Sequence, residues 1–364
     1  MVGHKPQLAV RMRDACAALI AAAALSGCVS PAGRPRPESV PIADYARPEN
    51  LPVVDFHTHL NGDMDAGRLL ELMDRSGVGA MVLMPRYYAN PRDGGYGSDT
   101  QAADLARNHP GRFIPFVAGQ RGELGQGPRS AWHDPDAAGR YLADAERKLR
   151  GGEFYGLGEY ILRHYAYSLR GSGQSGGEVS LPADAPLMHR IAALGARYGV
   201  PVVLHLEAEP EAAEQAVRLF EAHPDTTFIW AHNCGRAGAD QIRRLLGRFP
   251  RLMCDLGGMM VTPNDPGGYG RYWPRRTPYV HLVQADGGSV YPEMLALFEE
   301  FSDRYLLGTD TAHTPALRFY GERIYAARQL LSQLSPAAAR RIAYENAARL
   351  IASRHIPDHE ERHD

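Results

Sequence analysis

Leu51-Pro-Val-Val-Asp-Phe-His-Thr-His-Leu60 is a short apolar run that ends in two histidines one residue apart. In an extended strand, the side chains of residues i and i+2 point to the same side. His57 and His59 therefore aim two imidazole nitrogens at one point, and such neutral donors suit a transition metal such as zinc. The pair predicts a metal site at the end of a buried strand.

Four later apolar runs also end in a side chain that can bind a metal. Glu159, His205, His232 and Asp310 end the runs 153–159, 200–205, 226–232 and 304–310. These runs are rich in β-branched or aromatic residues and are too short for independent helices, which is typical of buried parallel strands. In a (β/α)₈ barrel the carboxyl ends of all strands meet at one face, where the catalytic residues lie. We therefore expect these side chains to meet the two histidines there.

The rest of the chain fits such a barrel. Strands are predicted at residues 53–56, 79–84, 112–117, 154–158, 201–204, 227–231, 252–256 and 305–308, and helices at 66–76, 134–150, 185–198, 210–223, 239–249 and 292–302. Asp134-Pro and Ser335-Pro look like helix starts, with a capping residue before a proline in the first turn. The alternation predicts an α/β fold, a single-domain TIM barrel over residues 51–354, followed by a polar tail at 355–364.

The ordered set His57-Thr58-His59, His205, His232 and Asp310 resembles the amidohydrolase superfamily of metal-dependent hydrolases, and within it the amidohydrolase-2 branch. Residues 344–350, Tyr-Glu-Asn-Ala-Ala-Arg-Leu, are similar to the closing Asn-Ala-x-Arg-Leu element of that branch. The similarity spans residues 51–351. It implies an enzyme that acts on a small molecule, but membership of so diverse a branch does not name the substrate.

The resemblance implies a role for each of these residues. His57 and His59 would bind a first metal ion, with His205 as a further ligand. His232 would bind a second ion or, in members with one metal, contact the substrate or the metal-bound water. Asp310 would bind the metal and shuttle the proton of the attacking water, whose pKa a bound divalent ion lowers toward about 7. Zinc is the expected cofactor, with manganese or iron as alternatives.

Several members of the superfamily bridge two metal ions with a carbamylated lysine from the fourth strand. The chain has two lysines, Lys5 in a predicted signal peptide and Lys148 in a predicted helix, so this bridge is excluded. Glu159 is the natural substitute, since some members use a glutamate at this place. The alternative is that Glu159 orients a histidine or meets a basic group of the substrate. The number of ions is therefore left open between one and two.

Basic side chains beyond the strand ends are candidate substrate contacts. Arg86, Arg163 and Arg236 follow the second, fourth and sixth predicted strands, and His313 follows Asp310. A planar guanidinium group matches a carboxylate or phosphate, so these residues favour an acidic substrate. The alternative is that arginine fills every surface role, because only two of the 40 basic residues are lysines.

Three long segments extend from the predicted strands. Residues 119–133 and 259–289 are candidate substrate walls or a lid, the second being rich in Gly, Pro and aromatic residues that include Tyr269, Tyr272, Trp273 and Tyr279. The alternative for them is surface packing or a homo-oligomer contact. Residues 166–181 are predicted to be a flexible insertion. A net charge of −2 gives no reason to expect a nucleic-acid partner.

The amino terminus predicts export. Arg11 and Arg13 precede an apolar run at 15–25 that ends in Leu25-Ser-Gly-Cys28, so residues 1–27 are interpreted as a lipoprotein signal peptide. Cys28 would carry the lipid, and the proline-rich residues 28–50 would tether the barrel to a membrane. In a Gram-negative cell this places the chain at the periplasmic face of the outer membrane.

Of the four cysteines, Cys16 would be removed with the signal peptide and Cys28 would carry the lipid. Cys234 and Cys254 are interpreted as buried free thiols, although an exported compartment would permit a bond.

Three functions remain open. The first is a lipid-anchored hydrolase that uses metal-bound hydroxide to cleave a C–N or C–O bond in an amide, lactone, ester or cyclic imide. The second is a metal-dependent decarboxylase, because the same branch includes such enzymes. The third is a non-catalytic envelope lipoprotein that binds a ligand or a partner, against which the presence of Asp310 counts.

Overall fold

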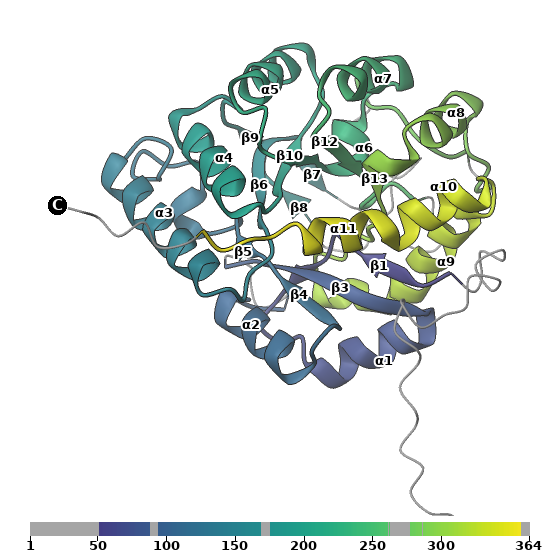
Figure 1. The fold of residues 1–364 in the computed structure, drawn as a ribbon, viewed down its shortest axis with the longest axis horizontal. Coiled ribbons are helices and arrows are strands. Elements are labelled where there is room, and N and C mark those ends of the chain that lie inside the picture. The colour runs from purple at the N-terminus through teal and green to yellow at the C-terminus, as the bar shows by residue number, and fades with distance from the viewer. Residues whose placement is uncertain are drawn as a thin grey trace, which may run out of the picture. The chain divides into compact units, whose positions relative to one another are not determined.

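The computed structural model describes residues 51–87, 94–168, 175–260, 262, 277–285 and 287–357. Within them, parallel strands alternate with helices in the predicted order (Figure 1). The barrel strands are β1 (Val53–Asp55), β3 (Val78–Pro85), β4 (Phe113–Pro115) with β5 (Val117–Ala118), β6 (Leu157–His164), β10 (Val202–Leu206), β11 (Phe228–Trp230), β12 (Leu252–Asp255) and β13 (Tyr305–Leu306). Strand β2 (His59–Leu60) continues the course of β1 beside β3.

Hydrogen bonds close these strands into a barrel. One run pairs β1, β3 and β4, and another pairs β5, β6, β10, β11, β12 and β13, all in parallel. The two runs join where Phe116 N donates to Leu83 O at 3.0 Å and where Phe56 N donates to Leu307 O at 2.9 Å. The eight predicted strands therefore form the predicted (β/α)₈ barrel.

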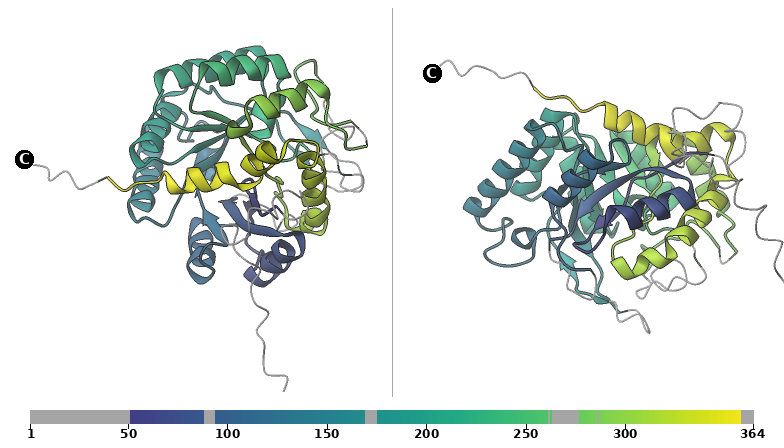
Figure 2. Two further views of the ribbon diagram at one scale, coloured as in Figure 1. Left: turned by 45° about the vertical axis from the view of Figure 1, so that its right-hand side comes forward. Right: turned by 90° about the horizontal axis from the view of Figure 1, so that it is seen from below.

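Helices surround the strands (Figure 2). They are α1 (Ala66–Ser76), α2 (Asp99–Asn108), α3 (Pro135–Arg150), α4 (Pro186–Tyr198), α5 (Pro210–Ala222), α7 (Ala239–Arg248), α8 (Pro292–Glu300) and α9 (Tyr320–Leu331), followed by α10 (Pro336–Arg340) and α11 (Asn346–Ala352). Short 3₁₀ helices lie at η4 (Gly122–Leu124), η5 (Ser302–Arg304) and η6 (Thr314–Phe319), and a π-helical segment, η7 (Arg341–Glu345), lies between α10 and α11. Asp134 and Ser335 cap α3 and α10 through their side chains, as predicted.

The apolar core has two layers. The inner layer fills the barrel with side chains such as Val54, Val82, Phe116 and Ile229, and the outer layer lies between the strands and the helices. Helix α11 crosses the strands in Figure 1 and adds Leu350 to the inner layer.

Hydrogen bonds place α11 at the amino ends of the strands. Asn346 Nδ2 donates to Tyr305 O at the start of β13, at 2.7 Å. The α11 helix therefore closes the end of the barrel opposite the carboxyl ends of the strands.

The structure departs from the predicted elements in several places. Helices α2 and α9 were not predicted, and β6 runs six residues past the predicted end at Gly158. It continues because His164 pairs with Val179 of β9 (Val179–Ser180) and His205 of β10 pairs with Ile161. Glu159 therefore lies near the start of the fourth strand and not at its end.

The inserted segment and several other predictions fall partly or wholly outside the described residues. The described parts of segment 166–181 form β7 (Tyr167–Ser168), β8 (Ser175–Gly176) and β9. Outside the described residues lie the predicted signal peptide, Cys28, the tether, residues 169–174 of the predicted insertion, Tyr269, Tyr272, Trp273 and the end of the polar tail. None of the described helices is long and apolar enough to cross a membrane.

Candidate metal centre

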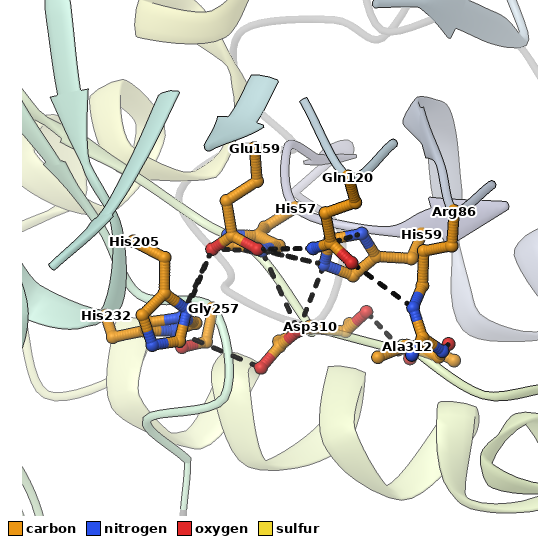
Figure 3. Close-up of polar contacts among 12 residues, drawn as sticks. His57, His59, Arg86, Gln120, Glu159, His205, His232, Gly257, Asp310 and Ala312 are labelled. Atoms are coloured by element: carbon orange, nitrogen blue, oxygen red, sulfur yellow. Dashed lines mark hydrogen bonds and ion pairs between the residues drawn. The ribbon is translucent and has the colours of Figure 1, made fainter. Parts of the chain in front are cut away.

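The structure brings all six predicted metal ligands together at the carboxyl end of the barrel (Figure 3). They come from five places in the barrel: His57 and His59 from the β1–β2 run, Glu159 from β6, His205 from β10, His232 after β11 and Asp310 after β13. Five of the side chains are buried, whereas the Asp310 side chain is 22 % exposed. Asp310 is thus the predicted ligand whose side chain is accessible to solvent.

The first half of the centre is the His57–His59 pair. Their Nε2 atoms lie 3.3 Å apart, as the i and i+2 positions of an extended chain predict. Glu159 places Oε1 3.4 Å from the Nε2 of His57 and Oε2 3.4 Å from the Nε2 of His59. Asp310 Oδ1 lies 3.7 and 3.5 Å from the same two nitrogens. Two imidazoles and two carboxylates therefore face one point.

The second half is the His205–His232 pair. The Nδ1 of His205 and the Nε2 of His232 lie 2.9 Å apart. Glu159 Oε1 is 3.2 Å from the first nitrogen and 3.4 Å from the second. Glu159 therefore lies between the two histidine pairs, as Figure 3 shows.

Hydrogen bonds on the far side of the rings decide which nitrogen faces the centre. The Nδ1 of His57 lies 3.0 Å from Asp255 Oδ2, and the Nδ1 of His232 lies 2.8 Å from the carbonyl oxygen of Gly257. An acceptor at Nδ1 holds the proton there and leaves Nε2 free to bind a metal. The sequence reasoning missed Asp255, although a polar residue at the end of β12 is the same signal that identified the other ligands.

Gln120 was also missed, and it connects the centre to two candidate substrate contacts. Its Nε2 donates to Glu159 Oε2 at 2.9 Å, and its Oε1 accepts from Arg86 Nε at 3.3 Å. The Nη1 of Arg86 donates to the carbonyl of Ala312 at 2.6 Å and lies 2.9 Å from His313 Nδ1. Arg86 and His313 are thus together at the segment that directly follows Asp310. The missed signal was a polar residue two positions after β5, which completes the third strand.

The other two candidate arginines pair with carboxylates. Arg163 forms ion pairs with Glu178 and Glu209 at the end of β6. Arg236 is fully buried and pairs with the buried Glu207, whose Oε1 lies 3.6 Å from the Nε2 of His205. Arg236 therefore acts on the second half of the centre through Glu207.

The backbone after β11 forms a left-handed turn, within the segment α6 (Ala231–Arg236). From His232 to Arg236, five successive residues have φ between 51° and 72°. Left-handed helical backbone costs about 1–2 kcal/mol for each residue other than glycine, so the surrounding contacts must hold it. Such strained backbone is typical of functional sites, and Asp310 also has a positive φ, of 51°.

The interpretation of Cys234 and Cys254 as free thiols was wrong, because the two form a disulfide. The left-handed turn directs Cys234 back against β12, where its Cα lies 4.9 Å from that of Cys254. This separation is in the range that a disulfide spans. Sequence patterns do not reveal a left-handed turn of non-glycine residues, so the proximity was not predictable.

The electrostatic field in the centre favours positive charge. Burial alone would lower the pKa of His57, but the charges of Asp255 and Glu159 raise it to about 10. Burial likewise opposes protonation of His205, yet Glu159 raises its pKa to about 9. Burial would raise the pKa of Glu159, but His57 and His205 hold it well below the usual range. The carboxylates are therefore poised to neutralise bound cations.

Comparisons with known proteins identify the family and the fold of the chain. A family model described as amidohydrolase matches residues 54–352. No curated protein matches the sequence. An uncharacterised TIM-barrel protein from Bordetella bronchiseptica is 15 % identical, with 83 % of this chain and 99 % of that chain covered and a TM-score of 0.52. A putative amidohydrolase from Staphylococcus aureus is 14 % identical, with 83 % and 100 % covered and a TM-score of 0.51. At these identities the two structures show a shared fold.

Proposed function

Because the chain belongs to the amidohydrolase family, we propose that this enzyme is a hydrolase that cleaves a C–N or C–O bond of a small molecule at a two-metal centre. Amides, lactones, esters and cyclic imides are the substrate classes that this chemistry covers. The observation that carries the proposal is the position of Glu159, whose carboxylate lies within 3.4 Å of a ring nitrogen from each of the four histidines.

The residues present fit two divalent ions. Four imidazole nitrogens and two carboxylates form a nitrogen and oxygen donor set, which suits zinc and also manganese or iron. Lys148 on α3, the lysine among the described residues, pairs with Asp99 of α2 and Asp144 of α3 and not with the centre. Glu159 therefore takes the place that a carbamylated lysine fills in other members of the superfamily.

Each residue has a defined task in the proposed centre. His57 and His59 would hold one ion with Asp310, His205 and His232 would hold the other, and Glu159 would be shared. Bound divalent ions lower the pKa of coordinated water toward about 7 and polarise the scissile carbonyl. We propose zinc for both positions.

Asp310 is placed to move the proton of the attacking water. Its carboxylate faces both histidine pairs and is the exposed member of the set. Burial alone would raise the pKa of Asp310, but His59 and His57 lower it, so the carboxylate is ionised, the form in which a general base starts. It can then pass that proton to the leaving group, as a positioned general base and acid does.

A decarboxylase is the second candidate, favoured by the position of Arg86. Its guanidinium group contacts Gln120, which donates to Glu159, and also contacts His313 and the carbonyl of Ala312 in the segment after Asp310 (Figure 3). Such a group would hold a substrate carboxylate near the metals. The non-catalytic lipoprotein gains no support, because the chain belongs to a family of enzymes.

The experiment that tests the proposed hydrolase uses the purified full chain, stripped with a chelator and reloaded with zinc, manganese or iron. A panel of lactones, esters, amides, cyclic imides and aromatic carboxylates is assayed in ¹⁸O-labelled water. Hydrolysis predicts metal-dependent turnover with ¹⁸O in the product. Release of carbon dioxide without ¹⁸O incorporation would identify a decarboxylase, and binding of less than one equivalent of each metal would refute the metal centre.

We also propose that the enzyme is exported and lipid-anchored through Cys28. The support is the signal-like sequence before Cys28 and the buried Cys234–Cys254 disulfide, since such bonds persist mainly in oxidising compartments. Growth with a labelled fatty acid should label the wild-type chain and not the Cys28→Ala variant. A wild-type chain that stays unlabelled and in the soluble fraction would contradict the anchor.

A further inference from the structure

The Cys234–Cys254 disulfide joins two segments that each carry a residue of the metal centre. Cys234 lies two residues after His232 in the left-handed turn, and Cys254 directly precedes Asp255 on β12. Asp255 in turn accepts from His232 N at 3.2 Å through Oδ1 and contacts the Nδ1 of His57 through Oδ2. The cross-link is therefore one residue away from a carboxylate that contacts both halves of the centre.

We propose that this disulfide is a positioning element for the second metal ion. This proposal rests on the two-metal centre of the proposed function. The cross-link holds the left-handed turn against β12 and so keeps the Nε2 of His232 beside His205 and Glu159. A chain that lacks the cross-link then binds the ion at the His205–His232 half more weakly, while the His57–His59 half keeps its ion.

The contacts of the turn explain why the effect falls on one half. Ala208 N donates to Gly235 O at 3.0 Å, and Arg236 pairs with Glu207, so the later part of the turn is attached to the segment after β10. The disulfide and the bonds of His232 to Asp255 and Gly257 attach the earlier part to β12. The His57–His59 pair is carried by strand pairing to β3 and by hydrogen bonds to the segment after β13, and Asp255 behind His57 is held on β12 by its pairing with Leu306 of β13.

The two sulfur atoms are also inaccessible once the chain is folded. Cys234 and Cys254 are both 0 % exposed. A dithiol reductant would break the S–S bond, transfer its two thiol protons to the cysteine sulfurs and become a cyclic disulfide, but it must first reach them. The cross-link therefore acts when the chain folds, and it makes complete metal loading depend on folding in an oxidising compartment.

The test compares the full-length wild type, in its oxidised form, with the double variant Cys234→Ala/Cys254→Ala. A second variant, Cys234→Ala/Cys254→Val, restores part of the lost volume without a cross-link. Leu149→Ala, a buried change in the outer core on α3, serves as a matched control for general destabilisation. Zinc content is measured against a graded series of chelators, and the cobalt-substituted proteins are compared by visible absorption at one and two equivalents.

We expect two equivalents in the wild type and in Leu149→Ala. Both cysteine variants should keep the first ion and bind the second about 10–100-fold more weakly, the effect typical of losing a support behind a metal ligand. Their cobalt spectra should lose the contribution of the second equivalent. Unchanged affinity for both ions in the cysteine variants, or an equal loss in Leu149→Ala, would overturn the inference. A wild type that binds fewer than two ions would instead overturn the two-metal centre of the proposed function.

Discussion

His57 and His59 reach the metal centre from a regular extended run, whereas His232 reaches it from a left-handed turn. The first pair follows from strand geometry alone, because alternate side chains of a strand share a face. The second pair needs a strained backbone, a disulfide and a buried ion pair to bring its nitrogens together. Local strand periodicity thus forms the His57–His59 half of the centre, whereas tertiary contacts form the His205–His232 half. The two halves should therefore respond differently to perturbation.

The largest expected effect comes from the residue that faces both halves. Asp310→Asn removes the group that accepts and returns the proton, so kcat should fall by about 10²–10⁴-fold, the range typical of general acid–base catalysis. At saturating zinc the metal content should be retained, because the asparagine amide oxygen can still bind the first ion and the four histidines and Glu159 remain. Steady-state kinetics with metal analysis on the same sample check this. Full activity with bound metal would remove Asp310 from the reaction.

The pH dependence of metal binding should differ between the two halves, because the histidine that must lose a proton has a different pKa in each half. In the metal-free protein the pKa of His57 is about 10 and that of His205 about 9. Below these values the imidazoles are protonated and do not bind a metal, so the affinity should rise with pH. For each proton that the metal displaces, the affinity rises about tenfold per pH unit. If two protons are displaced, the affinity rises up to about 100-fold between pH 7 and 8.

Calorimetric titration with zinc in buffers of different ionisation enthalpy measures the protons released. The rise in affinity should level off near pH 9 for the second half and near pH 10 for the first. Binding that releases no protons at pH 7 would contradict these pKa shifts.

Two glycine variants should each weaken one half, by about 10–100-fold in the affinity for one ion. A Cβ at Gly308 would lie 2.5 Å from His57 Cβ, so Gly308→Ala should displace the first pair. A Cβ at Gly235 would meet Leu206 O and lie 2.7 Å from Trp230 Nε1, so Gly235→Ala should displace the turn and the second pair. Stepwise zinc titration of both variants, each serving as the control for the other, separates the two losses. Equal losses of both ions in both variants would mean that the centre responds as one unit.

The same contrast explains what the sequence could predict. The strands and most helices follow from apolar periodicity and capping residues, and the ligands follow from polar side chains at the ends of strands. Glu159 was identified although the strand boundary was wrong, because the side chain still points into the barrel. Asp255, which supports the tautomer of His57, and Gln120, which donates to Glu159, are also polar residues at or soon after strand ends and could have been found.

The remaining features depend on contacts between distant segments. The disulfide requires the left-handed turn, and the pairing of Arg163 and Arg236 requires Glu209 and Glu207 to lie beside them. No local pattern encodes these proximities. Helix α2 was missed because its low apolar content hides the periodicity, although Ser98 caps it through its side chain.

The position of α11 determines at which end of the barrel the chain can be attached to a support without covering the metal centre. Arg328 donates to Leu51 O at 2.9 Å and His355 N donates to Tyr198 O at 3.1 Å, so both boundaries of the barrel lie at the pole that α11 covers. The metal centre opens at the opposite pole. Immobilisation on a resin, fusion to a carrier or display on a particle through either boundary would therefore leave the catalytic mouth facing the surrounding solution.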